Sequence, residues 1–285
     1  MHPKVSQSII DTYNEVGVAH IQGAVSAQWM SAMTHVLDSA IADLRSGKPA
    51  NRSSTLLGPA EFEDHDGYIR LIKIYWNYAN LRKVVEHSDY PEMVADVIGS
   101  DSMQPWIDGT FIKEGRDPQT ATPWHNDECL FPLSGQHSPS MWIAMKDVDH
   151  DNAPLQTLAA SNKDKHRHVS SWAKDGITPP SNFHPWRELL ERAHAPNADI
   201  RVWTAKAGDM LVIHSKTIHA SLPRTTQRDG RRIGFSLRWI GSDIRYEHNP
   251  TARNPPFQGL DAVTEGAPIP ESILPIIWRR TAAPP

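Results

Sequence analysis

A histidine and an aspartate stand two positions apart in the segment TPWHNDECLF, as His125 and Asp127. Together they offer one imidazole nitrogen and one carboxylate oxygen, two of the three protein ligands in a common type of iron site. The pair alone is a weak signal, because the same spacing arises by chance and also suits two polar residues at the edge of a loop. A metal site needs a third ligand from elsewhere in the chain.

The segment GDMLVIHSKTIHAS contains two histidines near the end of an expected strand, His214 and His219. Either would complete a facial triad of two histidines and one carboxylate, which leaves three metal positions open. Those positions suit Fe(II) with a bidentate co-substrate and O2. The residues themselves leave the choice between the two histidines open.

An arginine follows this segment at Arg232, in RRIGFSLRW. A guanidinium that points into a barrel is costly to bury unless it pairs with an anion, and its planar fork matches a carboxylate with two parallel hydrogen bonds. We therefore expect Arg232 to bind the distal carboxylate of 2-oxoglutarate. The alternative is a surface charge beside Arg231 and Arg238.

The elements that position these residues are expected to be strands, because the residue pattern after Gly99 is typical of β-structure. Turn residues there separate a series of β-branched and aromatic runs. The runs are MQPWIDGTFIKEG, SMWIAMKDV, PLQTLAA, IRVWTAKAG, DMLVIH and RIGFSLRWIG. Such a core closes as a sandwich or as a jelly roll. Alternate residues of a strand share a face, so His125 and Asp127 can both point into the mouth of the core.

The first hundred residues predict mostly helices. A short helix from Val5 to Val16 ends at Gly17, a strand VAHIQG follows, and Ser26 can cap a longer helix. The segment 48–67 reads as a polar loop and YIRLIKIYW as one strand, and NLRKVVEH and YPEMVADVIG read as two short helices.

Four segments resemble the phytanoyl-CoA dioxygenase (PhyH-like) family of Fe(II)/2-oxoglutarate-dependent oxygenases, in its bacterial biosynthetic branch. They are TPWHNDECLFP, MWIAMKDVDHDNAPLQTLAAS, GDMLVIHSKTIHAS and RRIGFSLRWIGSDIRY, in family order over roughly residues 105 to 246. The resemblance implies a mainly β fold with N-terminal helices and a double-stranded β-helix core (jelly roll, cupin-like). We predict one domain over 1–285, with a helical section over about 1–100, a jelly-roll core over about 101–246 and a C-terminal tail that wraps the surface.

The resemblance also implies a set of site residues. The iron ligands are His125, Asp127 and His219. The residues of the co-substrate pocket are Arg232, Ser221 and Trp142. His219 is favoured over His214 because the ligand in this family is followed by a small residue and a serine. Asp127 disfavours a halogenase, in which a small residue replaces the carboxylate to admit chloride.

Two turns depart from the family pattern. Where the family usually has Asn-Gly-Pro-Leu, this chain has Asn152, Ala153, Pro154 and Leu155, and where it has Pro-Gly-Ser-His, this chain has Ala159, Ala160, Ser161 and Asn162. Neither departure touches the metal ligands or Arg232.

The resemblance implies hydroxylation of an unactivated C–H of a small metabolite, with release of succinate and CO2, and we expect this metabolite to be anionic. Fe(II) is the implied cofactor, with 2-oxoglutarate and O2 as co-substrates. One alternative is a desaturase or cyclase of the same family. Another is a non-oxygenase metal-binding cupin-like protein that uses Zn or Mn and gives Arg232 no role.

Four residues are predicted to contact the substrate: Arg70, Lys73, Trp76 and Arg167. Arg70 and Lys73 could bind an acidic group, and Arg167 lies in the basic segment DKHRH, which could cover the pocket. Each has an ordinary structural alternative, because a strand carries surface charges, a tryptophan is most often core and a charged loop is most often solvated. A CoA thioester is disfavoured because no extended basic surface for its phosphates is evident.

Composition narrows the class of partner. The chain has 285 residues, with 29 basic and 33 acidic side chains and a net charge of −4, which gives no strong field for nucleic acid or membranes. It has no apolar run of the length that a membrane span needs, and its N-terminus lacks the apolar core of a secretory signal. The single cysteine, Cys129, cannot form an internal disulfide and is expected to be a packing residue. We expect a cytoplasmic protein that acts on a small molecule, and the sequence does not encode its oligomeric state.

Overall fold

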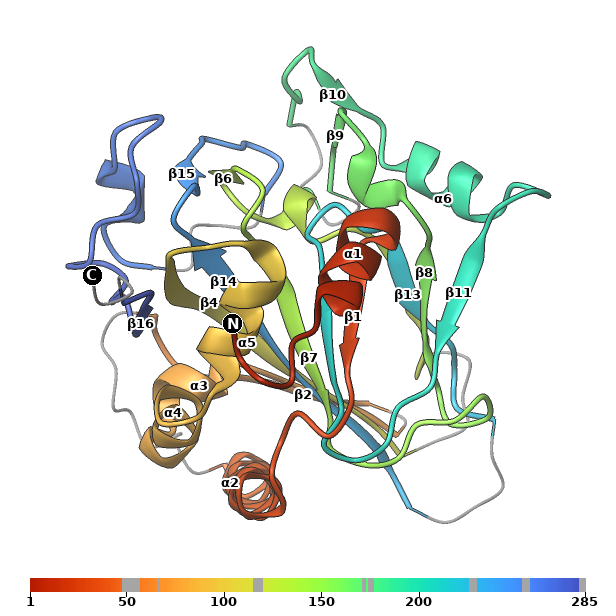
Figure 1. Cartoon of the computed structure of the whole chain (residues 1–285), viewed down its shortest axis with the longest axis vertical. Coiled ribbons are helices and arrows are strands. Elements are labelled where there is room, and N and C mark those ends of the chain that lie inside the picture. The colour runs from red at the N-terminus through yellow and green to blue at the C-terminus, as the bar shows by residue number, and fades with distance from the viewer. Residues whose placement is uncertain are drawn as a thin grey trace.

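Two antiparallel sheets face each other in the structure, a computed structural model that describes residues 1–47, 57–65, 67–114, 120–170, 173, 177–225, 230–252 and 257–281 (Figure 1). Eight strands form the central fold. They are β4 (Ser102–Lys113), β5 (Thr122–His125), β7 (Ser140–Ala144), β8 (Leu155–Leu158), β11 (Ile200–Trp203), β12 (Met210–Ile213), β13 (His219–Ser221) and β14 (Arg232–Gly241).

These strands pair in a nested order. The first pairs with the last, β4 with β14, and the following pairs are β5 with β13, β7 with β12 and β8 with β11, all antiparallel. Nested pairing of this kind is the topology of the double-stranded β-helix, or jelly roll. The predicted fold is therefore confirmed, and the alternative of a simple sandwich is excluded.

Additional strands extend the larger sheet to the order β1-β12-β7-β14-β4-β3-β2, with β16 also paired to β4. The added strands are β1 (Val18–Ile21), β2 (Glu61–His65), β3 (Tyr68–Ile72) and β16 (Trp278–Arg279). The smaller sheet has the order β11-β8-β13-β5, so β5 is its edge strand. Two short pairs lie outside these sheets: β6 (Leu133–Ser134) with β15 (Arg245–Tyr246), and β9 (Arg167–His168) with β10 (Phe183–His184).

Helices cover the outer face of the larger sheet, as predicted for the first hundred residues (Figure 1). They are α1 (Gln7–Val16), α2 (Ala27–Arg45), α3 (Ile74–Asn77), α4 (Ala79–Glu86) and α5 (Tyr90–Ile98). Ser26 caps α2 by accepting a hydrogen bond from the Trp29 backbone N–H at 3.3 Å, and Gly17 ends α1 in the left-handed conformation. A sixth helix, α6 (Arg187–Ala193), packs on the smaller sheet.

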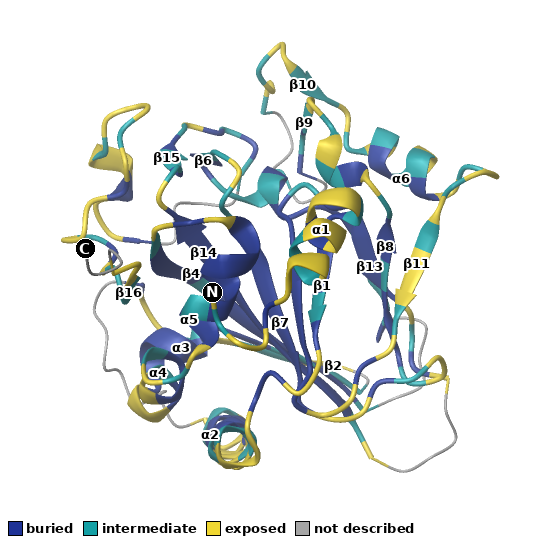
Figure 2. Ribbon diagram, viewed as in Figure 1, coloured by how far each residue is buried: buried dark blue, intermediate teal, exposed yellow. Residues whose placement is uncertain are grey.

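Successive side chains of each strand in the larger sheet point to opposite faces, so they divide between two layers. Phe235 and Leu237 of β14 face the helices and join one large apolar core. Trp142 and Leu211 face the other way and pack against Leu155 of the smaller sheet. Figure 2 shows the resulting concentration of buried residues along the larger sheet. The inner layer also contains polar residues, and these form the site described below.

Two predictions for the chain before residue 100 are wrong. The predicted polar loop contains β2, whose five residues pair with β3, while residues 48–56 and 66 of that loop lie outside the described residues. The predicted strand YIRLIKIYW ends at Ile72, because Lys73 takes a left-handed conformation with φ 67° and α3 begins after it. Asp108 of β4 stabilises this change by accepting hydrogen bonds from the backbone N–H groups of Ile74 and Tyr75.

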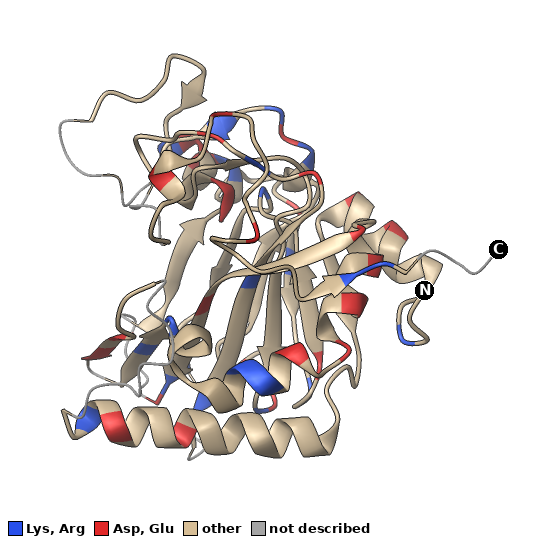
Figure 3. Ribbon diagram, turned by 90° about the vertical axis from the view of Figure 1, so that its left-hand side faces the viewer, with Lys and Arg blue, Asp and Glu red and all other residues tan. Residues whose placement is uncertain are grey.

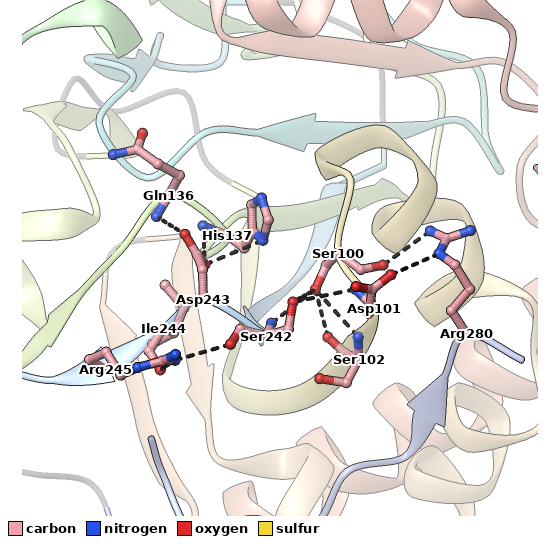
Figure 4. A network of polar contacts seen from close by, with 10 residues as sticks. All are labelled: Ser100, Asp101, Ser102, Gln136, His137, Ser242, Asp243, Ile244, Arg245 and Arg280. Atoms are coloured by element: carbon pink, nitrogen blue, oxygen red, sulfur yellow. Dashed lines mark hydrogen bonds and ion pairs between the residues drawn. The ribbon is translucent and has the colours of Figure 1, made fainter. Parts of the chain in front are cut away.

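The turn after β14 is joined to the start of β4 and to the C-terminal tail (Figure 4). The carboxylate of Asp243 accepts hydrogen bonds from the backbone N–H groups of Gln136 and His137, and the Ser242 backbone N–H donates to Ser100 Oγ at 2.9 Å. Arg280 donates to the Ser100 carbonyl at 3.0 Å. The tail also buries apolar side chains in the large core: Phe257, Leu260, Ile269 and Leu274.

Charged residues of both signs are mixed along the ribbon, including on α2 (Figure 3). No helix in the described part of the chain combines the length and the apolar character that a membrane span requires.

Candidate metal centre

Three side chains with metal-ligand atoms meet between the two sheets: His125, Asp127 and His219. One ligand atom from each lies within 4.8 Å of the others, and all three residues are buried. Two imidazoles and one carboxylate are the donor set of a facial triad. The three residues predicted to hold the metal are therefore brought together by the fold.

The two histidines are direct neighbours on adjacent strands. His125 of β5 lies opposite His219 of β13, with their ring centroids 4.2 Å apart. Each Nδ1 makes a 2.8 Å hydrogen bond to a backbone carbonyl, that of Pro123 for His125 and that of Thr217 for His219. Because Nδ1 donates its proton to the carbonyl, Nε2 carries the free lone pair of each ring, as a metal ligand requires.

Asp127 reaches the site by a different route from the one predicted. It lies beyond the end of β5 with a helical backbone conformation, φ −78° and ψ −28°, at the start of the short 3₁₀ helix Glu128–Leu130. Its backbone N–H donates to the Ser215 carbonyl at 2.9 Å. The turn, and not the alternation of a strand, therefore places its carboxylate beside His125, whose Nε2 lies 3.9 Å from Asp127 Oδ1.

The carboxylate of Asp127 is held on both oxygens. Ser140 donates to Oδ2, and Nη2 of Arg238 donates to Oδ1 at 3.3 Å. Ser140 and Arg238 face each other in the pairing of β7 with β14. Burial raises the pKa of Asp127, but Arg238 and the two histidines outweigh burial and hold the pKa below its ordinary value.

The pKa of His125 is lowered to about 3, chiefly by burial and then by the neighbouring His219. A neutral imidazole beside an ionised carboxylate is the protonation state in which both groups bind a metal ion. The electrostatics of the cluster therefore match its geometry.

The predicted co-substrate residues lie in the cavity next to this cluster. Arg232, Ser221 and Trp142 line it together with the three ligand residues. Arg232 is 1 % exposed, and its Nε and Nη2 have no hydrogen-bond partner among the described residues. Burial lowers its pKa to about 10. A buried guanidinium without an anion is costly, so this arginine has the properties of a binding site for a carboxylate.

Trp142 supports Arg232 from one side. The guanidinium carbon of Arg232 lies 4.9 Å from the centroid of the Trp142 ring, within the range of a cation–π contact. The ring passes so close to Gly234 that a Cβ there would lie 2.3 Å from Trp142 Nε1. Glycine is therefore required at position 234 by the approach of the tryptophan.

A larger cavity of about 340 Å³ adjoins the metal cluster. Its size falls in the range of sites for small organic ligands. Most of its lining is apolar, including Ile72, Ile107, Phe111, Leu130 and Phe131. His125 and Arg238 belong to the walls of both cavities. A molecule in the larger cavity would therefore lie beside the metal ligands.

The four residues predicted to contact the substrate are placed differently from one another. Arg70 lines the larger cavity, but its Nε and Nη2 donate to the two oxygens of Glu63 at 3.0 and 2.8 Å. Lys73 does not line it and pairs with Glu61 at 2.7 Å.

The other two predicted contacts lie away from the larger cavity. Trp76 is core, with Nε1 donating to the Trp106 carbonyl at 3.0 Å. Arg167 pairs with Glu247 and donates to the Leu133 carbonyl at 3.0 Å. The structure thus brings Arg70 alone of the four to the cavity wall, and Arg70 already has a carboxylate partner.

Sequence reasoning missed several polar residues at the site. Ser140 and Arg238 hold Asp127, and Lys113 donates from Nζ to Ser221 Oγ at 2.6 Å. Asp108 lines the larger cavity, and burial raises its pKa to about 7. Of these residues, Arg238 could have been predicted from the sequence. It follows Arg232 by an even number of positions on one strand, so the two side chains share a face of the sheet.

Two residues near the ligands have other roles. His214, the alternative to His219, accepts a hydrogen bond from the Lys216 backbone N–H at its Nδ1 and contacts the Tyr13 ring. Cys129 is buried, donates to the Asn126 carbonyl, and has its pKa raised to about 12, chiefly by burial. A thiol in that state is not a nucleophile, which agrees with its predicted packing role.

The sequence profile of the phytanoyl-CoA dioxygenase (PhyH) family matches residues 13–233, which include all three ligand residues and Arg232. The chain belongs to this family. The resemblance inferred from the four motifs is therefore confirmed, and with it the class of enzyme, an Fe(II)- and 2-oxoglutarate-dependent oxygenase. No curated protein matches the chain by sequence.

Several solved structures share the fold at low sequence identity. The carbocyclase SnoK from nogalamycin biosynthesis, described as non-heme and α-ketoglutarate-dependent, is 17% identical with a TM-score of 0.70, covering 95% of this chain and 96% of its own. The epimerase SnoN from the same biosynthesis is 18% identical with a TM-score of 0.68, covering 98% of both chains. EctD from S. alaskensis, solved with 2-oxoglutarate and 5-hydroxyectoine, is 15% identical with a TM-score of 0.64, covering 93% of this chain and 86% of its own. At these identities the likeness shows that the fold is shared.

Proposed function

We propose that this chain binds Fe(II) through His125, Asp127 and His219, binds 2-oxoglutarate through Arg232, and hydroxylates a C–H bond of a small molecule. The observation that carries the proposal is the pairing of a buried three-ligand cluster with a buried arginine that has no anion partner among the described residues. A cupin-like protein that merely binds zinc or manganese would leave the burial of Arg232 without a compensating contact.

The residues of the chain fit both groups. Nε2 of each histidine and the ionised carboxylate of Asp127 match a divalent iron ion. Iron held there would activate O2, the oxidant, so that 2-oxoglutarate is oxidised to succinate and CO2 with one oxygen atom and the substrate C–H is hydroxylated with the other. Arg232 would take the distal carboxylate of 2-oxoglutarate, with Trp142 fixing the plane of the guanidinium and Ser221 lining the same cavity.

The other residues of the site orient these groups. Ser140 and Arg238 hold Asp127 in place, so its carboxylate does not have to be ordered when the metal arrives. Thr217 and Pro123 hold the two imidazoles in one tautomer. The apolar wall of the larger cavity excludes water from the C–H bond that is attacked.

Hydroxylation is one of several outcomes that this donor set supports. A carbocyclase and an epimerase are among the structural neighbours, and EctD was solved with a hydroxylated compound. Desaturation or cyclisation is the second candidate, since both would use the same metal ligands and the same anchor. The product formed from an identified substrate distinguishes the two.

One experiment tests the metal and co-substrate sites together. Anaerobic addition of Fe(II) and 2-oxoglutarate to the purified protein should give the weak visible charge-transfer band of the chelate, and Arg232→Met should weaken 2-oxoglutarate binding at least about tenfold while iron still binds. The matched control is Arg231→Met, whose arginine pairs with Asp38 near the surface. Equal loss of iron and 2-oxoglutarate in Arg232→Met, or no band with the wild-type fold intact, contradicts the proposal.

We also propose that residues 1–285 form one domain, because residues of α2, the strands and the tail share one apolar core. The near balance of charge supports a small-molecule partner over a nucleic acid. The single buried cysteine supports a cytoplasmic location.

A further inference from the structure

Two arginines line the larger cavity within the described part of the chain, Arg70 and Arg238, and they differ in what their donors do. The Arg70 guanidinium is bonded to both oxygens of Glu63 and lies 3.7 Å from a carboxylate oxygen of Glu61. The charge of Arg70 is therefore compensated by two carboxylates of the neighbouring strand β2. An acceptor that arrives in the cavity would have to displace one of these carboxylates to use it.

Arg238 has N–H donors that make no hydrogen bond to a described residue. Its one hydrogen bond to a described residue runs from Nη2 to Asp127 Oδ1 at 3.3 Å, and its buried Nε has no partner. A guanidinium has five N–H donors in one rigid plane. The group that holds the aspartate ligand can therefore donate to a second acceptor at the same time, and donors left unsatisfied inside a protein favour the arrival of such an acceptor.

The position of Arg238 fixes where that acceptor would lie. Arg238 and His125 are both in the walls of the larger cavity and of the co-substrate cavity. An atom bonded to Arg238 is therefore close to the metal ligands, at the inner end of the larger cavity. The remaining wall is largely apolar and offers Ile72, Ile107, Phe111, Leu130 and Phe131 to the rest of the ligand.

We propose that Arg238 recognises the substrate through an acceptor oxygen, a carbonyl, hydroxyl or carboxylate, carried next to the carbon that is oxidised, on a molecule whose remaining body is apolar. This rests on the proposed function, because it takes the larger cavity as the substrate site. The proposal assigns substrate recognition to Arg238, which also holds Asp127. Arg70 and Lys73, which were predicted to bind the substrate, are paired to glutamates instead.

Two isosteric probes test this assignment. Acetophenone carries a carbonyl oxygen where α-methylstyrene carries a CH2 group. Both are small relative to the cavity. With Mn(II) as the metal and saturating 2-oxoglutarate, the paramagnetic relaxation of probe protons in NMR reports binding beside the metal. Acetophenone should bind about tenfold more tightly than α-methylstyrene to the wild type, the effect of one charge-assisted hydrogen bond.

The variants distinguish a loss of substrate recognition from a general loss of the site's structure. The preference for acetophenone should vanish in Arg238→Met and in the second variant Arg238→Gln, return in part in Arg238→Lys, and persist in the matched control Arg70→Met. The Mn(II) affinity of each variant is measured first, so that the metal is saturating throughout. A partial rescue by lysine is a response that a purely structural role for Arg238 would not give.

The outcomes that overturn the assignment are distinct from those that overturn the function. Absence of a preference in the wild type, a preference that survives in Arg238→Met, or its loss in Arg70→Met each contradicts the role of Arg238 while the metal site stands. Failure of the wild type to bind Mn(II) and 2-oxoglutarate contradicts the proposed function, and the assignment of Arg238 falls with it.

Discussion

Lys113 lies directly opposite Arg232 in the pairing of β4 with β14, and both side chains are buried. The Lys113 Nζ donates to Ser221 Oγ at 2.6 Å and to the Leu222 carbonyl at 2.8 Å. Two neighbouring basic groups are thus linked to the co-substrate cavity, Arg232 as part of its wall and Lys113 through its hydrogen bond to Ser221. The pKa of Lys113 is lowered to about 6, first by burial and then by Arg232.

Binding of 2-oxoglutarate should therefore take up a proton near neutral pH. Lys113 is mostly neutral at pH 7, and a carboxylate on Arg232 cancels the repulsion and favours the charged lysine. Calorimetry at pH 7.5 in two buffers of different ionisation enthalpy should give different apparent binding enthalpies. The difference should disappear in Lys113→Met. Identical enthalpies in both buffers for the wild type would show that Lys113 does not change its protonation.

The same lysine predicts how stability depends on pH. The unfolded chain holds the lysine proton up to its ordinary pKa of 10.5, whereas the folded chain loses it at about 6. Between these values the unfolded state binds more protons, so the penalty that Lys113 places on folding is full below about pH 6 and fades as the pH rises toward 10.5. Urea unfolding at pH 6 and pH 9 should show a smaller difference in the free energy of unfolding for Lys113→Met than for the wild type. An unchanged difference contradicts the assignment.

Gly234→Ala should damage the co-substrate site through Trp142. The new methyl group would meet the Trp142 indole, and the displaced ring would no longer support Arg232. We expect the KM for 2-oxoglutarate to rise about tenfold, the effect of weakening one charge-assisted contact, and stability to fall by about 1–3 kcal/mol from overpacking. Adding Trp142→Phe should recover part of both losses, because the smaller ring leaves room for the methyl group. No recovery would mean that the clash lies elsewhere.

Ser140→Ala should weaken metal binding about 10- to 100-fold, which is the usual effect of losing a residue that orients a ligand. The Ser140 hydroxyl donates to Asp127 Oδ2, and no other hydrogen bond to that oxygen comes from the described residues. Titration of Mn(II), followed by its electron paramagnetic resonance signal, measures the affinity. Ser242→Ala is the control, since that serine is in the turn after β14 and far along the strand from Arg232. Equal affinities in Ser140→Ala and the wild type contradict the role of Ser140.

Ala160→Gly should stabilise the protein. Ala160 is exposed and has φ 59°, a left-handed conformation that costs an alanine about 1–2 kcal/mol. Part of the gain is lost because glycine adds freedom to the unfolded chain, about 0.4–1 kcal/mol, so we expect a net gain of roughly 0.5 kcal/mol. Chemical denaturation compares it with Ala159→Gly, a neighbour without a positive φ, which should lose stability. A loss for both would show that Ala160 is not strained.

The strands β4, β7, β12 and β14 could be predicted because they are buried on both faces. Their β-branched and aromatic runs are dense, and turn residues mark their ends. β2 escaped prediction because its sequence EFEDH is mostly charged, and charged residues are rare in strands. It forms nonetheless because Glu61 and Glu63 pair with Lys73 and Arg70 on or next to β3. That compensation depends on strand register, which a single sequence does not specify.

The meeting of the three candidate ligand residues could be predicted because each stands in a motif, whereas the residues that hold them come from segments that are distant in sequence. The route by which Asp127 enters the site was wrong, since it depends on a turn bonded to Ser215. The predicted substrate contacts stay predictions, and the structure shows why charge alone does not select them. Arg70 and Lys73 have the charge that was expected, but whether a charge is free depends on its neighbours in the folded chain.

The pairing of His125 with His219 has a consequence for the lifetime of the protein. β5 is the edge of the smaller sheet, and its one partner strand, β13, has an irregular register. An ion bound to both imidazoles would join these two strands. We therefore expect the iron-free protein to have a looser edge strand, whose unpaired backbone is open to proteases or to pairing with another chain.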